Sequence, residues 1–218
     1  MNDLQIDEAF TILSRIVHQW QSPAITILSQ RDKDPFKVLI SCILSLRTQD
    51  KTTAGASDRL FAIADNPEKM VALSIEMVER AIYPVGFYRN KSAQILGICR
   101  ILIEYYHGSV PDEIDELLKL KGVGRKTANL VVTLGFGKPG ICVDTHVHRI
   151  CNRWGYVNSK SPDETERALR NKLPTKYWLI INDLLVTFGQ NHCHPVSPRC
   201  SNCLLANLCD RIGVNKWR

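Results

Sequence analysis

The chain has 218 residues, 44% of them hydrophobic and 23% charged, and a formal net charge of +6. This length and composition fit one large or two small globular domains with a real hydrophobic core, and no apolar run approaches the length of a membrane span. Because no export signal opens the sequence, we expect its eight cysteines to stay reduced, which argues against a disulfide framework.

Helix signals begin early in the chain. Asp34 is a good N-cap acceptor, and Pro35 stands at the first helical position, where a missing amide costs nothing. The stretch 36–46 that follows is apolar almost all round. It therefore predicts a central helix buried on most sides.

Further helices are expected downstream. Apolar residues fall at helical spacing from Ile95 to Tyr105, and Gly108 follows as a stop signal. Ser161 and Glu164 have the spacing of a capping box at the start of another helix. Because strand-like alternation is hard to find and short Gly, Pro, Asn and Asp connections separate the helices, we predict an all-α fold.

The segment 114–137 predicts a hairpin of two helices joined by a tight turn. A short amphipathic helix leads into Gly122-Val123-Gly124, and a second helix begins at Arg125. No strand precedes the glycines, so a dinucleotide-binding loop is excluded. The glycines permit positive φ and close approach of another chain. Amides at the start of the second helix form an anion site suited to a DNA phosphate, without reading bases.

Basic residues cluster in and just after this hairpin. A clustered basic stripe is the electrostatic footprint of a nucleic-acid binder, although a solvated helix face would look similar. The residues concerned are Lys119, Lys121, Arg125, Lys126, Lys138, Arg149 and Arg153.

Two residues are candidates for a chemical role. Lys126 lies in the first turn of the second helix, where the helix dipole disfavours an ammonium and favours a nucleophilic amine. Its position alone favours an exposed or phosphate-binding lysine. Asp144 is a good N-cap for a helix over 145–154, and its carboxylate could also activate an amine or stabilise a developing cation. The sequence leaves these alternatives open.

Four cysteines near the C-terminus have the spacing of a metal site. Soft thiolates select zinc or iron–sulfur, and structural zinc sites usually have two close cysteine pairs. Here one close pair is flanked by longer loops, which favours an iron–sulfur cluster over a zinc knuckle or unliganded thiols. The residues are Cys193, Cys200, Cys203 and Cys209.

Three motifs together resemble the endonuclease III family of helix-hairpin-helix DNA glycosylases. They are the run Leu120–Asn129 around Gly122-Val123-Gly124-Arg125-Lys126, the run Val143-Asp144-Thr145-His146, and the cysteine spacing. The resemblance covers roughly residues 30 to 210, which is most of the chain.

The resemblance implies a fold of two helical lobes with DNA in the cleft between them. One would be a six-helix barrel over residues 29–138 that contains the hairpin. The other would join 1–28 to 139–218 and hold a [4Fe-4S] cluster on the four cysteines. We expect a cytoplasmic, nucleoid-associated monomer of a prokaryote, with damaged or abasic double-stranded DNA as its partner and no membrane association.

The resemblance also implies a bifunctional enzyme that removes oxidised pyrimidines and then nicks the abasic strand by β-elimination through a lysine Schiff base. Lys126 would attack C1′ of the damaged nucleotide, and Asp144 would assist it. Flipping that nucleotide out of the stack costs a few kcal/mol, less for lesions that weaken pairing. The mismatch-specific branches have serine or tyrosine at the lysine position. The alternatives to a bifunctional enzyme are therefore a mismatch-specific glycosylase that only removes the base, and a non-catalytic DNA-binding protein that contains zinc.

The sequence departs from the family at the gap left by the flipped base. Arg47 stands where bacterial members have a glutamine, with Gln49 two residues further on. An arginine can pair with guanine edges, so we expect Arg47 to contact the orphan base. Phe87 matches a family leucine and could wedge into the stack, or be an ordinary core residue. Arg199, inside the cysteine loop, could meet a phosphate.

Overall fold

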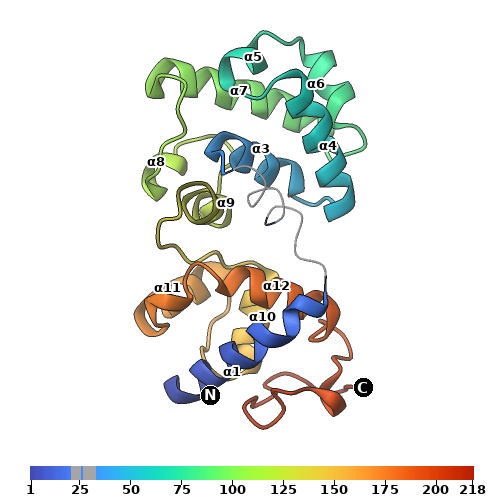
Figure 1. Cartoon of the computed structure of the whole chain (residues 1–218), viewed down its shortest axis with the longest axis vertical. Helices are drawn as coiled ribbons and strands as arrows, with labels where there is room; N and C mark the ends of the chain where they lie inside the picture. Colours follow the sequence, from blue (N-terminus) through green and yellow to red (C-terminus); the bar gives the residue numbers. More distant parts are fainter. Residues whose placement is uncertain (21–25, 27–32) are drawn as a thin grey trace. The chain divides into compact units, whose positions relative to one another are not determined.

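The structure is a computed structural model that describes residues 1–20, 26 and 33–218 (Figure 1). Throughout this part of the chain the regular secondary structure is helical and contains no strand, which confirms the all-α prediction. None of its helices is both long and apolar enough to span a bilayer. The elements are α1 (Asp3–Ile16), η1 (Val17–Gln19), α3 (Pro35–Ser45), α4 (Asp50–Ile63), α5 (Pro67–Val71), α6 (Ile75–Ile82), α7 (Tyr88–Tyr106), α8 (Ile114–Leu117), α9 (Arg125–Leu130), η2 (Val131–Gly135), α10 (Thr145–Arg153), α11 (Pro162–Lys172), η3 (Thr175–Tyr177), α12 (Ile181–Asn191) and η4 (Cys200–Asn202).

The chain divides into two compact units. Unit 1 combines Met1–Pro23 with Ile141–Arg218, and unit 2 is Ala24–Gly140. The start predicted for the barrel domain, Ser29, lies outside the described residues. Each unit is described separately below.

Helix α3 is the centre of unit 2. Its N-cap Asp34 accepts a hydrogen bond from the Phe36 amide at 2.8 Å, and Pro35 follows at the first helical position. Every residue from Val38 to Leu44 is buried, and the helix packs against α4, α7, α9 and η2. The prediction of a central buried helix is confirmed. Its polar residue Ser41 pairs with Ser57 of α4 at 3.1 Å, so a buried hydroxyl is not left unsatisfied.

Helix α7 follows the predicted stripe except at its end. The stripe residues Ile95, Ile98, Cys99 and Leu102 are buried. Tyr105 is 67% exposed, so its inclusion in the stripe was wrong. The helix ends where His107 and Gly108 both turn left-handed, and the Gly108 amide donates to the Leu102 carbonyl at 2.9 Å. This bond satisfies a terminal carbonyl, as glycine stops commonly do.

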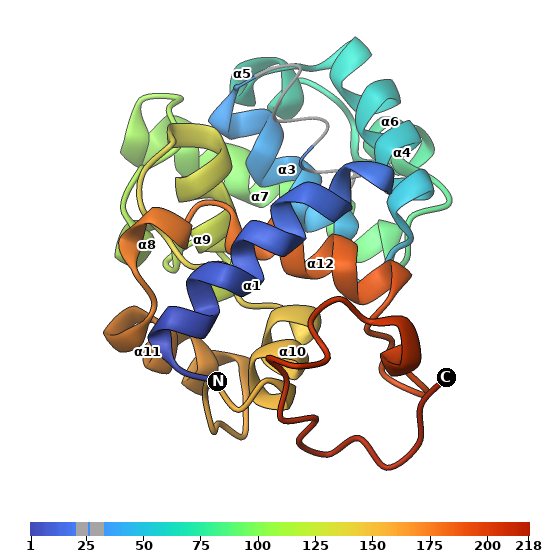
Figure 2. The same ribbon diagram turned by 60° about the horizontal axis from the view of Figure 1, so that its bottom comes forward.

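Unit 1 brings the two ends of the chain together. Helix α1 packs along α12, which is its neighbour in both ribbon views (Figures 1 and 2). Helix α10 packs against α11 and α12. The largest fully buried side chains of its core are Phe10, Trp154, Tyr156 and Phe188. After α12 the chain continues as the irregular C-terminal segment seen in dark red in Figure 2.

The start of α11 differs in one detail from a capping box. The Ser161 hydroxyl accepts from the Glu164 amide at 3.2 Å, as predicted. The Glu164 carboxylate accepts from the Lys160 amide at 2.8 Å, one residue before the Ser161 amide that a capping box would use. The amides of Lys160 and Glu164 are therefore both hydrogen-bonded to nearby side chains.

Candidate functional site

The helical hairpin of unit 2 depends on its two glycines in different ways. Gly122 has φ +78°, a left-handed conformation, and a Cβ there would collide with the side chain of Gln94. The Gln94 amide nitrogen donates to the Lys121 carbonyl at 3.0 Å and so holds the turn against α7. Gly124 has φ −95°, so the expectation of positive φ fails for it. A Cβ on Gly124 would meet nothing within 4 Å, which leaves open space for a ligand beside the turn.

The amides of the turn are only partly available to a ligand. The Val123 side chain is buried, and its amide donates to the Leu120 carbonyl at 3.0 Å. Gly124 is the N-cap of α9, whose first-turn amides have no partner inside the helix by geometry. The turn therefore offers fewer amides to an anion than the sequence suggests, because the Val123 amide is hydrogen-bonded within the turn.

Lys126 is the second residue of α9. Its side chain is exposed, and its charge acts on the thiol of Cys42 in α3. Burial raises the pKa of that thiol to about 12, and the lysine opposes the shift. Helix α9, which contains Lys126, packs against the central helix α3.

The predicted basic stripe does not form one uniform surface. Lys119 is paired with Glu116 at 2.6 Å, and Lys138 with Asp112 at 2.9 Å and Glu113 at 2.8 Å. Arg153 is only 8% exposed. These basic residues have structural partners, of which only the i,i+3 pair of Lys119 with Glu116 follows from sequence spacing.

Arg47 and Phe87 form a stacked pair on unit 2. The Arg47 guanidinium carbon lies 4.9 Å from the centroid of the Phe87 ring, a cation–π geometry. Both residues have a left-handed backbone conformation, with φ 55° and 59°, which is uncommon for residues with bulky side chains. Phe87 is 58% exposed, so the alternative of an ordinary core phenylalanine is wrong. Gln49, also exposed, stands at the N-cap position of α4, where its side chain makes no capping hydrogen bond.

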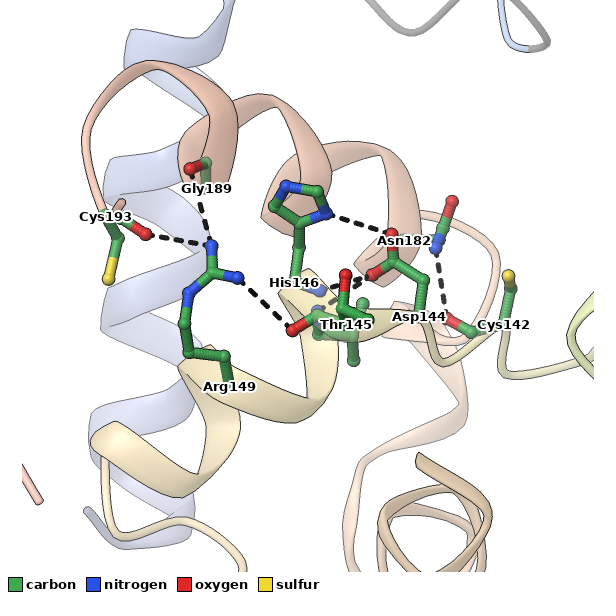
Figure 3. A network of polar contacts seen from close by, with 9 residues as sticks. Cys142, Asp144, Thr145, His146, Arg149, Asn182, Gly189 and Cys193 are labelled. Carbon is green, nitrogen blue, oxygen red and sulfur yellow. Dashed lines mark hydrogen bonds and ion pairs between the residues drawn. The ribbon is translucent and has the colours of Figure 1, made fainter. Parts of the chain in front are cut away.

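Asp144 is the N-cap of α10, as its local sequence predicts (Figure 3). Its Oδ1 accepts from the amides of His146 at 2.8 Å and Val147 at 3.0 Å. Its Oδ2 lies 3.0 Å from Nδ1 of the His146 ring. The side chain is 10% exposed. One oxygen therefore holds the helix, while the other faces a group that can exchange a proton.

Arg149 ties α10 to the start of the cysteine segment. Its Nη2 donates to the carbonyl of Cys193 at 2.9 Å and of Gly189 at 3.4 Å, and its Nη1 approaches the Thr145 carbonyl at 3.4 Å (Figure 3). Burial lowers the pKa of this guanidinium, which nevertheless stays charged at neutral pH. The arginine links the helix that Asp144 begins to the segment of the four cysteines.

The four predicted cysteine ligands line one pocket. It encloses about 390 Å³ not filled by atoms, part of it open to solvent, and Arg153, Trp154 and Leu205 complete its wall. Burial is the main cause that raises the pKa of Cys203 to about 11, and the other three thiols raise it further. Within the described ranges, no three His, Cys, Asp or Glu side chains form a group that could hold one metal ion. All four cysteines line this same pocket. They are Cys193, Cys200, Cys203 and Cys209.

Arg153, which was expected in the basic stripe, instead contacts the cysteine segment. Its Nη1 donates to the Cys193 sulfur at 3.3 Å and the His194 carbonyl at 2.7 Å, and its Nη2 to the Pro195 carbonyl at 2.7 Å. A basic residue three positions after the buried Ile150 was the available signal. Arg199, inside the same loop, is exposed, and its amide donates to the His192 carbonyl at 3.2 Å.

Fold and site together define an all-α protein with a helix-hairpin-helix turn that carries a lysine, a capping aspartate, and a C-terminal pocket of four thiols. Residues 40–175 match the family model described as HhH-GPD superfamily base excision DNA repair protein.

Named proteins show the same likeness. The chain is 48% identical to endonuclease III of Thermotoga maritima, with 84% of this chain and 85% of the relative covered. It is 41% identical to endonuclease III of Bacillus subtilis, with 81% of each chain covered. The structure of a trapped endonuclease III–DNA covalent intermediate, an estranged-adenine complex, matches with a TM-score of 0.84 at 35% identity over 97% of each chain. The chain belongs to the endonuclease III family of the HhH-GPD base excision DNA repair superfamily.

Proposed function

We propose that this chain, by its family a DNA glycosylase with abasic-site lyase activity, removes oxidised pyrimidines from double-stranded DNA and then nicks the strand. The observation that carries the proposal is Lys126, an exposed amine in the first turn of the hairpin helix, in a family whose relative has been trapped covalently on DNA. An amine at this place can form the covalent bond that a monofunctional enzyme lacks.

The neutral Lys126 amine attacks C1′ of the flipped nucleotide, and the bond from C1′ to the base breaks, so that the base leaves with the bonding electrons. The lysine nitrogen, cationic after the attack, loses a proton, and the departing base takes one up. The bond from C1′ to the ring oxygen then breaks as the protonated Schiff base forms, and the ring oxygen takes up a proton from water to become a hydroxyl. The iminium acidifies the C2′ protons, loss of one proton breaks the bond from C3′ to its phosphate, and water finally frees the lysine.

Asp144 is proposed to assist these steps with the carboxylate oxygen that does not cap α10. Oδ1 is committed to two backbone amides, while Oδ2 lies 3.0 Å from the His146 ring and can accept a proton or stabilise a cationic sugar. Because Asp144 belongs to unit 1 and Lys126 to unit 2, this role requires bound DNA to present one nucleotide to both residues.

The hairpin is proposed to bind the DNA backbone independently of sequence. Gly124 keeps the surface beside the turn open, Gly122 permits its left-handed bend, and Arg125 supplies positive charge at the start of α9. Val123 contributes by closing the turn. Arg199 is proposed to add a phosphate contact from the cysteine loop. We also propose that the enzyme acts on nucleoid DNA in the cytoplasm.

Trapping with borohydride tests the proposed function. The wild-type protein is mixed with duplex oligonucleotides that contain thymine glycol or an abasic site, and borohydride is added during the reaction. A stable protein–DNA adduct is expected, because borohydride reduces a Schiff base to an amine. Base release without an adduct would point to a mismatch-specific monofunctional glycosylase, and salt-sensitive binding without cleavage to a non-catalytic DNA-binding protein. Either result would contradict the proposal.

Arg47 is proposed to contact the base left opposite the flipped nucleotide. In Arg47→Ala we expect the preference for lesions opposite guanine over adenine to fall by about tenfold, since a bidentate contact to guanine contributes about 1–3 kcal/mol of discrimination. Excision from duplexes that differ only in the opposite base measures it. Arg47→Lys is the matched control, because it keeps the charge but loses the planar fork. An unchanged ratio in Arg47→Ala would refute this contact.

The four cysteines are proposed to hold a [4Fe-4S] cluster. The donor set fits, because the four cysteines line one pocket and a cluster takes one thiolate at each of its four irons. Arg153 adds positive charge beside Cys193. Since all four irons would be ligated by protein, the group would contribute structure and not a catalytic step. Its role would be to close the loop that contains Arg199.

The metal proposal predicts a yellow-brown protein with about four irons per chain. In Cys203→Ala we expect loss of most of the iron and of the visible absorption, together with weaker DNA binding. Cys151→Ala is the matched control, because this cysteine lies in the core of the same unit and outside the pocket. Iron analysis and absorption spectra measure both variants. A colourless wild-type protein with one zinc would overturn the cluster proposal.

A further inference from the structure

Lys91 is a buried lysine that none of the three motifs uses. It lies in the first turns of α7 and is 5% exposed. Its Nζ donates to the carbonyls of Leu44 at 2.8 Å and Leu46 at 2.6 Å, and to the Thr48 hydroxyl at 3.2 Å. Lysines are almost never so buried unless their charge is satisfied, and here three donors meet three acceptors.

The acceptors of Lys91 all belong to the segment that ends α3. The last carbonyls of a helix have no partner inside it, and a cation is favourable there. Leu46 is the C-cap of α3, and the next residue is the left-handed Arg47. Because the Leu46 carbonyl and the Thr48 hydroxyl stand on either side of Arg47 in the chain, the ammonium holds the backbone of this uncommon conformation from both sides.

The same lysine also belongs to the segment that presents Phe87. Its backbone amide donates to the Phe87 carbonyl at 3.0 Å. The Thr48 hydroxyl, which accepts from Lys91, accepts in addition from the Gly86 amide at 3.2 Å. A Cβ on Gly86 would lie 2.8 Å from the Arg47 carbonyl oxygen, so the two segments are in close contact. Lys91 and Thr48 therefore connect the two loops beneath the exposed stack of Arg47 on Phe87.

We propose that Lys91 is a positioning residue that joins the loops around Arg47 and Phe87 into one preorganised wedge for insertion into duplex DNA. This inference rests on the proposed function, in which the pair fills the gap left by a flipped nucleotide. Two left-handed residues on separate loops would otherwise have to be ordered upon binding. Holding them in advance removes that entropic cost from the flipping step.

The charge state of Lys91 is compatible with this role. Burial lowers the pKa of its ammonium to about 8, so most of the group is still charged at pH 7. Only the ammonium has three protons to donate, and it donates to three oxygens. A methionine at this position would keep most of the volume and remove every donor.

The test compares a substrate that needs the wedge with one that does not. In Lys91→Met we expect single-turnover excision from duplex DNA to fall about 10- to 100-fold, as misplacement of positioning groups does. Cleavage of an abasic site in a single strand, which has no opposite base and no gap, is expected to stay within about twofold. Lys69→Met, which removes an exposed lysine of the same unit, is the control and should change neither rate. Equal losses on both substrates would show a general structural role and overturn the proposal.

A double-mutant cycle provides an independent test. If Lys91 acts through the wedge, Lys91→Met should cause no further loss of duplex excision in a protein that already carries Arg47→Ala and Phe87→Ala. A full additive loss in that background would overturn the proposal. Should Lys91→Met fail to fold, Thr48→Val removes the shared hydroxyl and should give the same selective loss on duplex DNA. A wild-type protein that gives no borohydride adduct would instead refute the proposed function itself.

Discussion

Lys126→Gln is expected to abolish borohydride trapping and to lower strand nicking by about 10⁴-fold or more, because the variant lacks the nucleophile for the covalent intermediate. Glutamine is a polar, uncharged side chain one atom shorter than lysine and can take the same exposed position in α9. Binding to a duplex with an uncleavable abasic analogue should weaken by less than about tenfold, since only one positive charge is lost. Gel analysis of trapped adducts and of nicked strands measures the effect.

Lys121→Gln is the matched control for this variant. Lys121 is an exposed lysine of the same hairpin, and its carbonyl holds the turn through Gln94, which the substitution does not disturb. Removing its charge should lower DNA affinity and its salt dependence without affecting the adduct. If Lys126→Gln trapped as efficiently as the wild type, or if both variants lost the adduct equally, Lys126 would not be the nucleophile.

Asp144→Asn and Asp144→Ala are expected to separate two roles of one side chain. Asparagine is as good an N-cap as aspartate, so the Asn variant should keep its thermal stability and still lose about 10²- to 10⁴-fold in excision rate with the carboxylate charge. Alanine removes the cap as well, which should cost about 1 kcal/mol of folding free energy in addition. Thermal unfolding and single-turnover excision measure the two effects separately.

Asp34 is a suitable control for the aspartate variants. It caps α3 through the Phe36 amide, as Asp144 caps α10 through His146 and Val147. Asp34→Ala should destabilise the fold to a similar degree and leave the excision rate of the folded protein nearly unchanged. If Asp144→Asn retained full activity, capping alone would explain the residue, and its proposed catalytic assistance would be wrong.

Much of the site was predictable because its signals are local. A cap needs a side-chain acceptor within three residues of its amide, so Asp34, Asp144 and Ser161 could be assigned from neighbouring residues. The glycine turn of the hairpin and the spacing of the four cysteines are likewise short-range patterns. They sufficed for the all-α class, the family and the candidates for nucleophile, assisting acid or base, and metal ligand.

The long-range contacts that hold the segments around these residues became visible only in the tertiary structure. Lys91 meets Leu44 across 47 positions, and Arg153 meets Cys193 across 40. Lys91 was missed because its partners lie far away in the chain, and Arg153 was assigned to a surface stripe although its position three residues after the buried Ile150 was a local signal. The stacking of Arg47 on Phe87 also joins separate loops, and it turned two independent candidates into one feature.

The sequence by itself therefore determined the all-α class, the start of several helices and the candidates for reactive side chains, because these depend on residues within a few positions of each other. Only the tertiary structure decided which charged side chains are exposed, which form ion pairs, and which donate hydrogen bonds to loop carbonyls. The physical reason is that burial and long-range hydrogen bonds arise from packing between elements distant in the chain. The proposed reactive residues lie in short motifs, and the segments around the candidate site are held by contacts of Lys91, Gln94 and Arg153, which the tertiary structure alone shows.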